Sequence, residues 1–183
     1  YDAVAFFSTG LGDKHSHDAQ ISCMPTMLPE TVHKDNCDLD TDLLFEDKSA
    51  IYNPEARFVC LLANPVLPHS TGSISLRNAD PMCHPDIDLN YFDDPHDLKV
   101  MVSVMERALD IAENWPAERK LGELLVAPQL ARKHGYVPGA RPSTAMLEDT
   151  ALHYSTTVYH LCSTCRMGDV VDYRLRVKGV QGL

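Results

Sequence analysis

Proline interrupts this chain at short intervals and limits the length of any helix or strand that it can form. The 183 residues include 12 prolines against nine glycines, and pairs of prolines bracket short apolar runs. A proline inside a helix removes a backbone hydrogen bond and clashes with the preceding turn, and inside a central strand it removes a bond of the ladder. The sequence therefore favours many short elements joined by ordered loops over a helical bundle.

Length and charge narrow the class of protein further. With 44% hydrophobic residues, the chain is long enough for one core of ordinary size and predicts one compact unit. The formal net charge is -10 and the 16 basic residues are scattered, which argues against a nucleic-acid partner because phosphate binding needs clustered Lys and Arg. No apolar run approaches the roughly 20 residues that a membrane-spanning helix needs.

The cysteines indicate a reducing environment. Their number is even, but a chain of this length and ordinary composition does not need disulfide bonds to hold its core together. We therefore expect free thiols and a cytoplasmic location. The six positions are Cys23, Cys37, Cys60, Cys83, Cys162 and Cys165.

Alternating and continuous apolar runs predict strands in the first half of the chain. Residues 4–7 and 20–24 read as a hairpin-like pair of strands. Residues 57–63 form a continuous apolar run, which is typical of a central strand covered on both faces. Residues 73–77 alternate strictly, as a strand with one solvated face does. The acidic segment 30–56 reads as a solvated excursion at the edge of the domain.

The clearest helix begins at Asp93 or Asp94, either of which can cap the free backbone amides. Pro95 then occupies the first helical position, where its missing N–H costs nothing, and Pro116 ends the helix. Apolar residues recur at three- and four-residue steps and predict one stripe that packs into the core. Its members are Leu98, Met101, Val102, Met105, Ala108, Leu109 and Ala112.

A second helix is predicted from Ser143 or Thr144 to about Tyr154. Strands followed by helices without regular alternation indicate an antiparallel sheet backed by helices on one side, which is the α+β class.

The segment after this second helix carries the strongest chemical signal in the chain. A β-branched run leads as a strand to His160 at the start of a small-residue loop, and Gly168 then lets the chain turn back. His160, Cys162 and Cys165 lie within six residues, and two thiols spaced C-x-x-C can bind zinc. A fourth ligand is not obvious, which argues against a zinc site, so zinc is kept only as an alternative. The run Thr9-Gly10-Leu11-Gly12 does not predict a dinucleotide fold, because its third glycine is missing.

The order of motifs in this segment resembles the carboxy-terminal signature of the glucose-methanol-choline (GMC) oxidoreductases. The matching runs are Val158-Tyr159-His160-Leu161-Cys162-Ser163-Thr164-Cys165-Arg166-Met167-Gly168, then Val170-Val171-Asp172 and Leu175-Arg176-Val177-Lys178-Gly179-Val180. The resemblance extends upstream to residue 66 through Pro68-His69-Ser70-Thr71-Gly72-Ser73-Ile74-Ser75-Leu76, Asn78-Ala79-Asp80-Pro81, Pro85-Asp86-Ile87-Asp88, Asn90-Tyr91-Phe92 and Asp94-Pro95-His96-Asp97-Leu98. Leu161 stands where the family usually has proline, and Ser163 where it usually has glycine.

The resemblance implies an FAD-dependent enzyme that oxidises a small alcohol, similar to choline dehydrogenase and choline oxidase. By this resemblance, His160 is the catalytic histidine that accepts or directs the hydroxyl proton, and Val158 and Tyr159 line the substrate pocket. Residues 1–155 correspond to a substrate-binding domain built on an antiparallel sheet. Residues 156–183 correspond to an active-site strand and a segment that returns toward an FAD-binding domain.

The resemblance further implies that the chain is a fragment whose partner is the FAD-binding half of the same protein. We expect the fragment to be inactive alone and to self-associate as a homo-oligomer through the face that this half leaves bare. The alternative is a non-catalytic interaction domain, or a metal-binding one that uses His160, Cys162 and Cys165.

Overall fold

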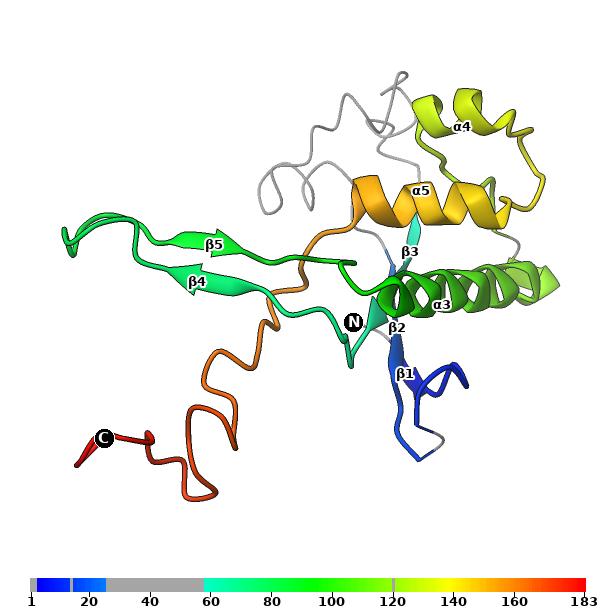
Figure 1. The fold of residues 1–183 in the computed structure, drawn as a ribbon. Helices are drawn as coiled ribbons and strands as arrows, with labels where there is room; N and C mark the ends of the chain where they lie inside the picture. Colours follow the sequence, from blue (N-terminus) through cyan, green and yellow to red (C-terminus); the bar gives the residue numbers. More distant parts are fainter. Residues whose placement is uncertain (1–2, 14, 26–57, 120) are drawn as a thin grey trace.

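Small antiparallel sheets and three α-helices make up the described part of the chain, residues 3–13, 15–25, 58–119 and 121–183 of a computed structural model (Figure 1). A three-stranded sheet has the order β1-β2-β3, and a two-stranded sheet pairs β4 with β5. The observed elements agree with the predicted α+β class. The acidic segment, residues 30–56, which was predicted to be a solvated loop at the edge of the domain, lies outside the described residues. The elements are β1 Ala3–Phe7, β2 Ala19–Pro25, β3 Val59–Pro65, β4 Ser73–Ser75, β5 Asp86–Asp88, α3 Pro95–Glu113, the 3-10 turn Ala117–Arg119, α4 Pro128–His134 and α5 Thr144–Tyr154.

The three-stranded sheet confirms the predicted hairpin but corrects the position of β3. β1 and β2 pair antiparallel with Ala5 opposite Ile21, and β2 pairs with β3 with Cys23 opposite Leu61. β2 is therefore the central strand, and β3 lies at an edge of the described sheet rather than in its middle. Most residues of β3 are half-buried. Contact with α3 on one face accounts for the apolar character of this strand, so a strand on each side is not needed.

The main core lies between α3 and the three-stranded sheet. Val100 and Val104 of α3 pack against Ala19 and Ile21 of β2, and Val104 has no exposed surface. Partly buried residues of β1, β3 and α3 complete this cluster: Phe7, Leu61, Ala63, Ala108 and Ile111.

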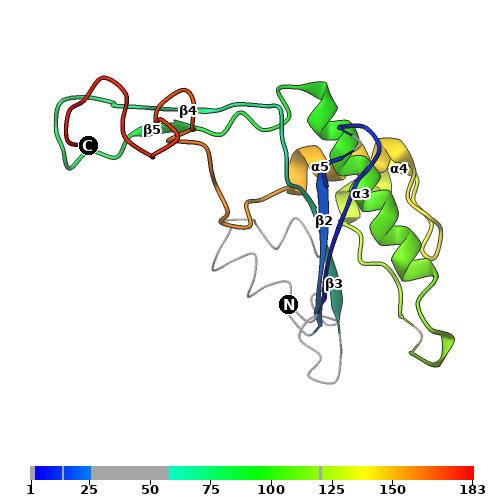
Figure 2. The ribbon, with the colours of Figure 1, turned by 90° about the horizontal axis from the view of Figure 1, so that it is seen from below.

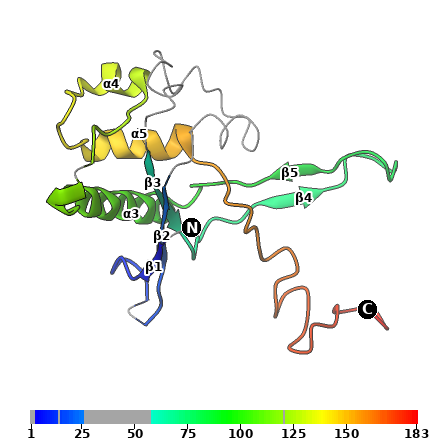
Figure 3. The same ribbon diagram turned by 180° about the vertical axis from the view of Figure 1, so that it is seen from behind.

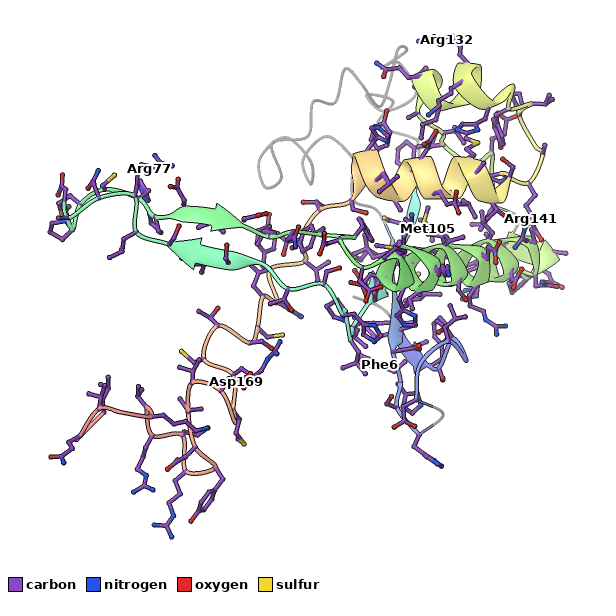
Figure 4. All side chains as sticks on the ribbon, in the orientation of Figure 1. Phe6, Arg77, Met105, Arg132, Arg141 and Asp169 are labelled. Carbon is purple, nitrogen blue, oxygen red and sulfur yellow. The ribbon has the colours of Figure 1, made fainter. Side chains whose placement is uncertain are left out.

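The sheet-facing stripe of α3 differs from the predicted one. It runs through Val100, Val104, Ala108 and Ile111, at four- and three-residue steps. Met105, which was predicted in the stripe, lies toward α5 instead (Figure 4). The helix is apolar over more than one face, and contact with the sheet decides which of these faces becomes the centre of the core.

The first turn of α3 anchors the chain that leads into it. Of the two predicted caps, Asp93 and Asp94, it is Asp94 that forms the N-cap, and its carboxylate accepts the backbone N–H of His96 at 2.8 Å. Asp97 is 4% exposed and accepts the backbone N–H groups of His69 and Ser70, both at 2.8 Å. Burial by itself raises the pKa of Asp97, but the hydrogen bonds from His69 and Ser70 outweigh burial and hold that pKa below its ordinary value.

The β4–β5 hairpin projects from the body as an arm (Figures 1 and 2). Gly72 lies at its base, where a Cβ would come within 2.1 Å of the backbone oxygen of Asp88, so any side chain there would force the strands apart. Both strands are exposed on both faces, in contrast to the predicted single solvated face. The alternating pattern is present, but no described element packs on either side; Ile74 and Ile87 are 57% and 61% exposed.

The helix α4 was not predicted, although its signals are in the sequence. Pro128 occupies the first helical position and Gly135 ends the helix in a left-handed conformation, with a φ of 60°. At seven residues the helix is too short to show a clear apolar period. α5 starts as predicted, with the Ser143 side chain accepting the backbone N–H of Met146.

Ion pairs join these helices to one another and to α3. Asp149 of α5 contacts Nζ of Lys133 and lies 2.6 Å from Nε2 of His134 on α4, and hydrogen bonds from these two side chains lower the pKa of Asp149. Arg141, labelled in Figure 4, reaches Asp110 at 2.8 Å and Glu113 at 2.7 Å on α3. None of the helices in the described ranges is long and apolar enough to cross a membrane.

Candidate active-site segment

The segment that carries His160 is irregular, which corrects the prediction of a strand. α5 ends at Tyr154, and residues 155–166 form neither helix nor strand. The chain instead leaves the body and runs toward the C-terminus without a neighbouring strand (Figures 1 and 3). The β-branched residues favour an extended backbone, but a strand forms only where another strand pairs with its N–H and C=O groups.

The backbone on either side of His160 is bent. Tyr159 and Ser163 have φ values of 63° and 72°, in the left-handed region that residues with side chains seldom adopt. The backbone N–H of Tyr159 donates to Oγ1 of Thr157 at 2.9 Å, which stabilises the turn before the histidine. A left-handed residue is incompatible with an extended strand, so this turn is a local reason why no strand reaches His160.

The three predicted site residues lie next to one another on the surface of the described chain. Val158 is half-buried, whereas Tyr159 is 61% exposed and His160 is exposed. Every residue from 161 to 170 is exposed as well. The structure therefore presents the imidazole of His160 on an open segment, accessible from outside.

The chain turns back after this segment, as Gly168 predicts. Gly168 has a φ of 95°, and its N–H donates to the carbonyl of Val171 at 2.8 Å. Val171 is 6% exposed and forms single bridges to Met167 and Val177. This return segment is thus a small folded unit of its own, built from turns rather than from a paired strand.

Asp172 stabilises the last turn of this unit. Its carboxylate accepts the backbone N–H groups of Arg174 and Arg176 and the Arg176 guanidinium. The hydrogen bonds from Arg176 are the main reason why the pKa of Asp172 lies below its ordinary value.

The glycine-containing loop after β1 does not form a phosphate-binding turn for FAD. The run Thr9-Gly10-Leu11-Gly12 leads from β1 into a loop, where Asp18 accepts the backbone N–H of Thr9 at 2.7 Å and its hydroxyl at 2.5 Å. No helix follows this loop, so its backbone amides are not arranged as a phosphate-binding turn. A shallow hollow lined by residues between Asp172 and Leu183 does not include His160.

In the part of the chain that the structure describes, no arrangement of side chains matches a zinc site. There, no group of three or more His, Cys, Asp and Glu side chains is arranged to hold a metal ion. His160, Cys162 and Cys165 are close in sequence but do not form such a group.

One polar cluster at the start of α3 was not foreseen from the sequence. The rings of His69 and His96 stack with their centroids 4.2 Å apart and an angle of 8° between their planes, and Nδ1 of His69 lies 3.4 Å from Asp94. The acidic first turn of the predicted helix was the available signal, since an Asp there can bind backbone N–H groups of a preceding segment. The cluster orders the base of the arm.

Exposed apolar side chains are concentrated on the arm and on the C-terminal segment. An exposed apolar surface of this kind is more often covered by another polypeptide than left in contact with solvent. Those on the arm are Ile74, Leu76, Met82 and Ile87, and those on the C-terminal segment are Tyr159, Leu161, Met167, Val170, Tyr173, Leu175, Val180 and Leu183.

Comparison with known proteins identifies the chain. The sequence model of the GMC oxidoreductase family matches residues 68–183. The chain is 35% identical over 126 residues to alcohol dehydrogenase [acceptor] of Pseudomonas putida, a match of 64% of this chain and 20% of that protein. It is 36% identical over 123 residues to choline oxidase of Arthrobacter globiformis, covering 62% of this chain and 20% of the relative.

A third relative is 5-(hydroxymethyl)furfural oxidase of Methylovorus sp. (strain MP688), 34% identical over 128 residues, with 63% of this chain and 23% of that protein covered. The chain spans about a fifth of the length of these curated relatives. The match of 68–183 agrees with the extent of the resemblance found in the sequence and contains both the arm and the His160 segment, so the chain belongs to the GMC oxidoreductase family and corresponds to its carboxy-terminal domain.

Proposed function

We propose that this chain is the substrate-binding and active-site-bearing portion of an FAD-dependent enzyme that oxidises a small alcohol. The observation that carries the proposal is the family match over residues 68–183, which contains the run around His160. The names of the relatives, an alcohol dehydrogenase and two oxidases, support a CH–OH donor.

His160 is the proton acceptor in this proposal. Oxidation of an alcohol to a carbonyl compound removes the hydroxyl proton and a hydride from the carbon. An imidazole that titrates near neutral pH can take this proton at a ring nitrogen, or direct its departure by a hydrogen bond. Bound FAD supplies the hydride acceptor.

Val158 and Tyr159 line the substrate pocket beside His160 in this proposal. The exposed ring of Tyr159 offers an apolar wall, and it can contact a cation if the alcohol carries one.

The open position of His160 supports a site that is completed by another part of the same protein. We propose that an FAD-binding half, outside the 183 residues, covers the exposed apolar side chains of residues 159–183 and of the arm. In this arrangement residues 1–155 form the substrate-binding domain, with helices backing one side of its sheet. Residues 156–183 return toward the FAD-binding half.

The 183-residue chain by itself is expected to bind no FAD tightly. The glycine-containing loop after β1 leads into β2 and not into a helix, so it forms no phosphate-binding turn for the diphosphate. The chain, purified after refolding in excess FAD and gel filtration, should show no visible flavin absorbance. A yellow product with stoichiometric flavin would contradict this division of the protein.

The isolated chain is also expected to self-associate, because the exposed apolar side chains of the arm and the C-terminal segment have no cover. Light scattering over a range of concentrations should show a rising average mass. The double substitution of Ile74→Ser and Ile87→Ser, which removes two exposed side chains of the arm, should lower this mass. A wild-type chain that stays strictly monomeric at high concentration would count against the exposed surface as an interface.

The alternative is a non-catalytic interaction domain, and it is favoured by Leu161 and Ser163 at positions where the family usually has proline and glycine. FAD in the purified full-length protein, detected by its visible absorbance, would separate an oxidoreductase from such a domain.

A further inference from the structure

Two thiols follow His160 on the same open segment. Cys162 and Cys165 are both free and exposed, whereas the other described cysteines, Cys23, Cys60 and Cys83, are partly buried. We propose that Cys162 and Cys165 form a reversible disulfide, and that its closure changes the surroundings of His160. The disulfide concerns this segment as the 183-residue chain exposes it, before the proposed FAD-binding half covers it; its consequence for catalysis rests on the proposed function.

The backbone between the two cysteines is already bent. Three residue steps span at most about 10 Å when extended, and a disulfide needs Cα atoms within about 7 Å. Ser163 is in the left-handed region with a φ of 72°, and Thr164 and Cys165 lie in a turn. A bent backbone brings the Cα atoms of the two cysteines closer together than an extended one, as a disulfide requires.

The loop around the two cysteines leaves room for the movement that brings their sulfur atoms together. Residues 155–166 belong to no helix or strand, and the side chains from 161 to 170 are all exposed. The two sulfur atoms can therefore approach one another by rotation within the loop, without moving the core between α3 and the sheet.

The chemistry balances with a low-molecular-weight disulfide, such as oxidised glutathione, as the oxidant. The thiolate of one cysteine attacks a sulfur of this disulfide, breaks its S–S bond and releases one glutathione thiolate. The second cysteine then attacks the protein sulfur of the mixed disulfide and releases the other glutathione. The protein loses two electrons and two protons, and two glutathione thiols form.

Exposure favours a bond that can be reduced again. Exposed or strained disulfides have more oxidising potentials than buried structural ones, and they are the labile and regulatory class. Cys60 provides a contrast within the chain, because burial, aided by the nearby Cys23, raises the pKa of its thiol. A thiol with a raised pKa has less of the nucleophilic thiolate and reacts more slowly.

His160 lies two residues before the first cysteine, between the left-handed residues Tyr159 and Ser163. Closure of the ring fixes the backbone from 162 to 165, so that only Leu161 separates the histidine from a rigid loop. A change in the backbone at Cys162 is therefore transmitted directly to the position of the imidazole.

The test uses the 183-residue chain. The reduced protein is incubated with oxidised glutathione, quenched with acid, alkylated and cleaved with trypsin. Cleavage after Lys133 and Arg166 releases both thiols on one peptide, because the bond between Arg141 and Pro142 resists trypsin. We expect this peptide to lose two hydrogen atoms and both alkylation sites, and to regain them with dithiothreitol. Two intact thiols, or two glutathione adducts, would overturn the proposal.

Single substitutions separate the two steps. Cys162→Ser should leave Cys165 as a stable mixed disulfide with glutathione, and Cys165→Ser should do the same at Cys162. Cys83, on a different tryptic peptide, reports the reactivity of a partly buried thiol in the same sample.

The link to His160 is read by NMR of its ring C–H signals in the reduced and oxidised chain. We expect a shift on oxidation that is absent in Cys162→Ser, and unchanged signals in the oxidised wild type would overturn the link. Neither measurement uses FAD or an alcohol, so failure here is distinguishable from failure of the proposed function.

Discussion

Replacement of His160 by alanine in the full-length oxidoreductase is expected to slow hydride transfer from the alcohol by about 10²- to 10⁴-fold, the usual range for loss of a general base. Binding of the alcohol should weaken much less. In the proposed mechanism the interaction of the imidazole strengthens as the alkoxide develops, so its removal penalises the transition state more than the bound alcohol. Rapid mixing of enzyme and alcohol, followed by the loss of flavin absorbance, measures the step directly.

Two neighbouring substitutions serve as matched controls for this result. Cys162→Ser and Cys165→Ser change the same exposed loop but should leave the rate largely intact under reducing conditions, because a hydride mechanism has no need of a thiolate. An unimpaired His160→Ala enzyme would remove His160 from the mechanism. A Cys165→Ser enzyme that retains flavin but has lost its activity would favour the metal-binding alternative.

Replacement of Asp97 by alanine is expected to cost about 2–5 kcal/mol of the free energy of unfolding, because it leaves two backbone N–H groups without their acceptor. These are the N–H groups of His69 and Ser70, which the buried carboxylate binds at 2.8 Å. The base of the arm should loosen from α3 at the same time. Urea unfolding followed by circular dichroism gives the stability, and hydrogen exchange at residues 69 and 70 gives the local effect.

Asp97→Asn is the matched variant, since it keeps the size of the side chain but can accept at only one oxygen, and it should cost less than alanine. The pH dependence gives an independent check. Because the pKa of Asp97 in the folded chain lies below its ordinary value of 3.8, its contribution is fully present above that value. The contribution is lost as the pH falls through the folded pKa. A wild-type chain and an Asp97→Asn chain with the same stability loss on acidification would contradict this role.

Several features followed from local sequence signals. The start of α3 at Asp94 and the start of α5 at Ser143 were predicted because a capping side chain and its backbone partner are two or three residues apart. The β1–β2 hairpin and the turn at Gly168 were likewise predictable from short stretches of chain. The family was predicted because its motifs survive in order over residues 68–183.

The candidate site was predictable only as a set of adjacent residues. The motif places Val158, Tyr159 and His160 side by side, and their assignment as site residues stays a prediction. The sequence did not reveal the left-handed turn at Tyr159, since a bulky residue gives no sign that it will adopt a positive φ. It also did not reveal that Asp97 binds a segment 27 and 28 residues earlier in the chain.

The sequence by itself thus determined the family and the starts of α3 and α5, and it predicted which residues bear the chemistry. Only the tertiary structure decided that β3 lies at an edge of the described sheet, that both faces of the arm are exposed, and that Val100 and Val104 rather than Met105 face the sheet. The physical reason is the range of the interactions. Caps and turns are satisfied within a few residues, whereas a strand or an apolar stripe acquires its position from partners far away in the chain, and the segment before His160 stays irregular where no such partner lies beside it.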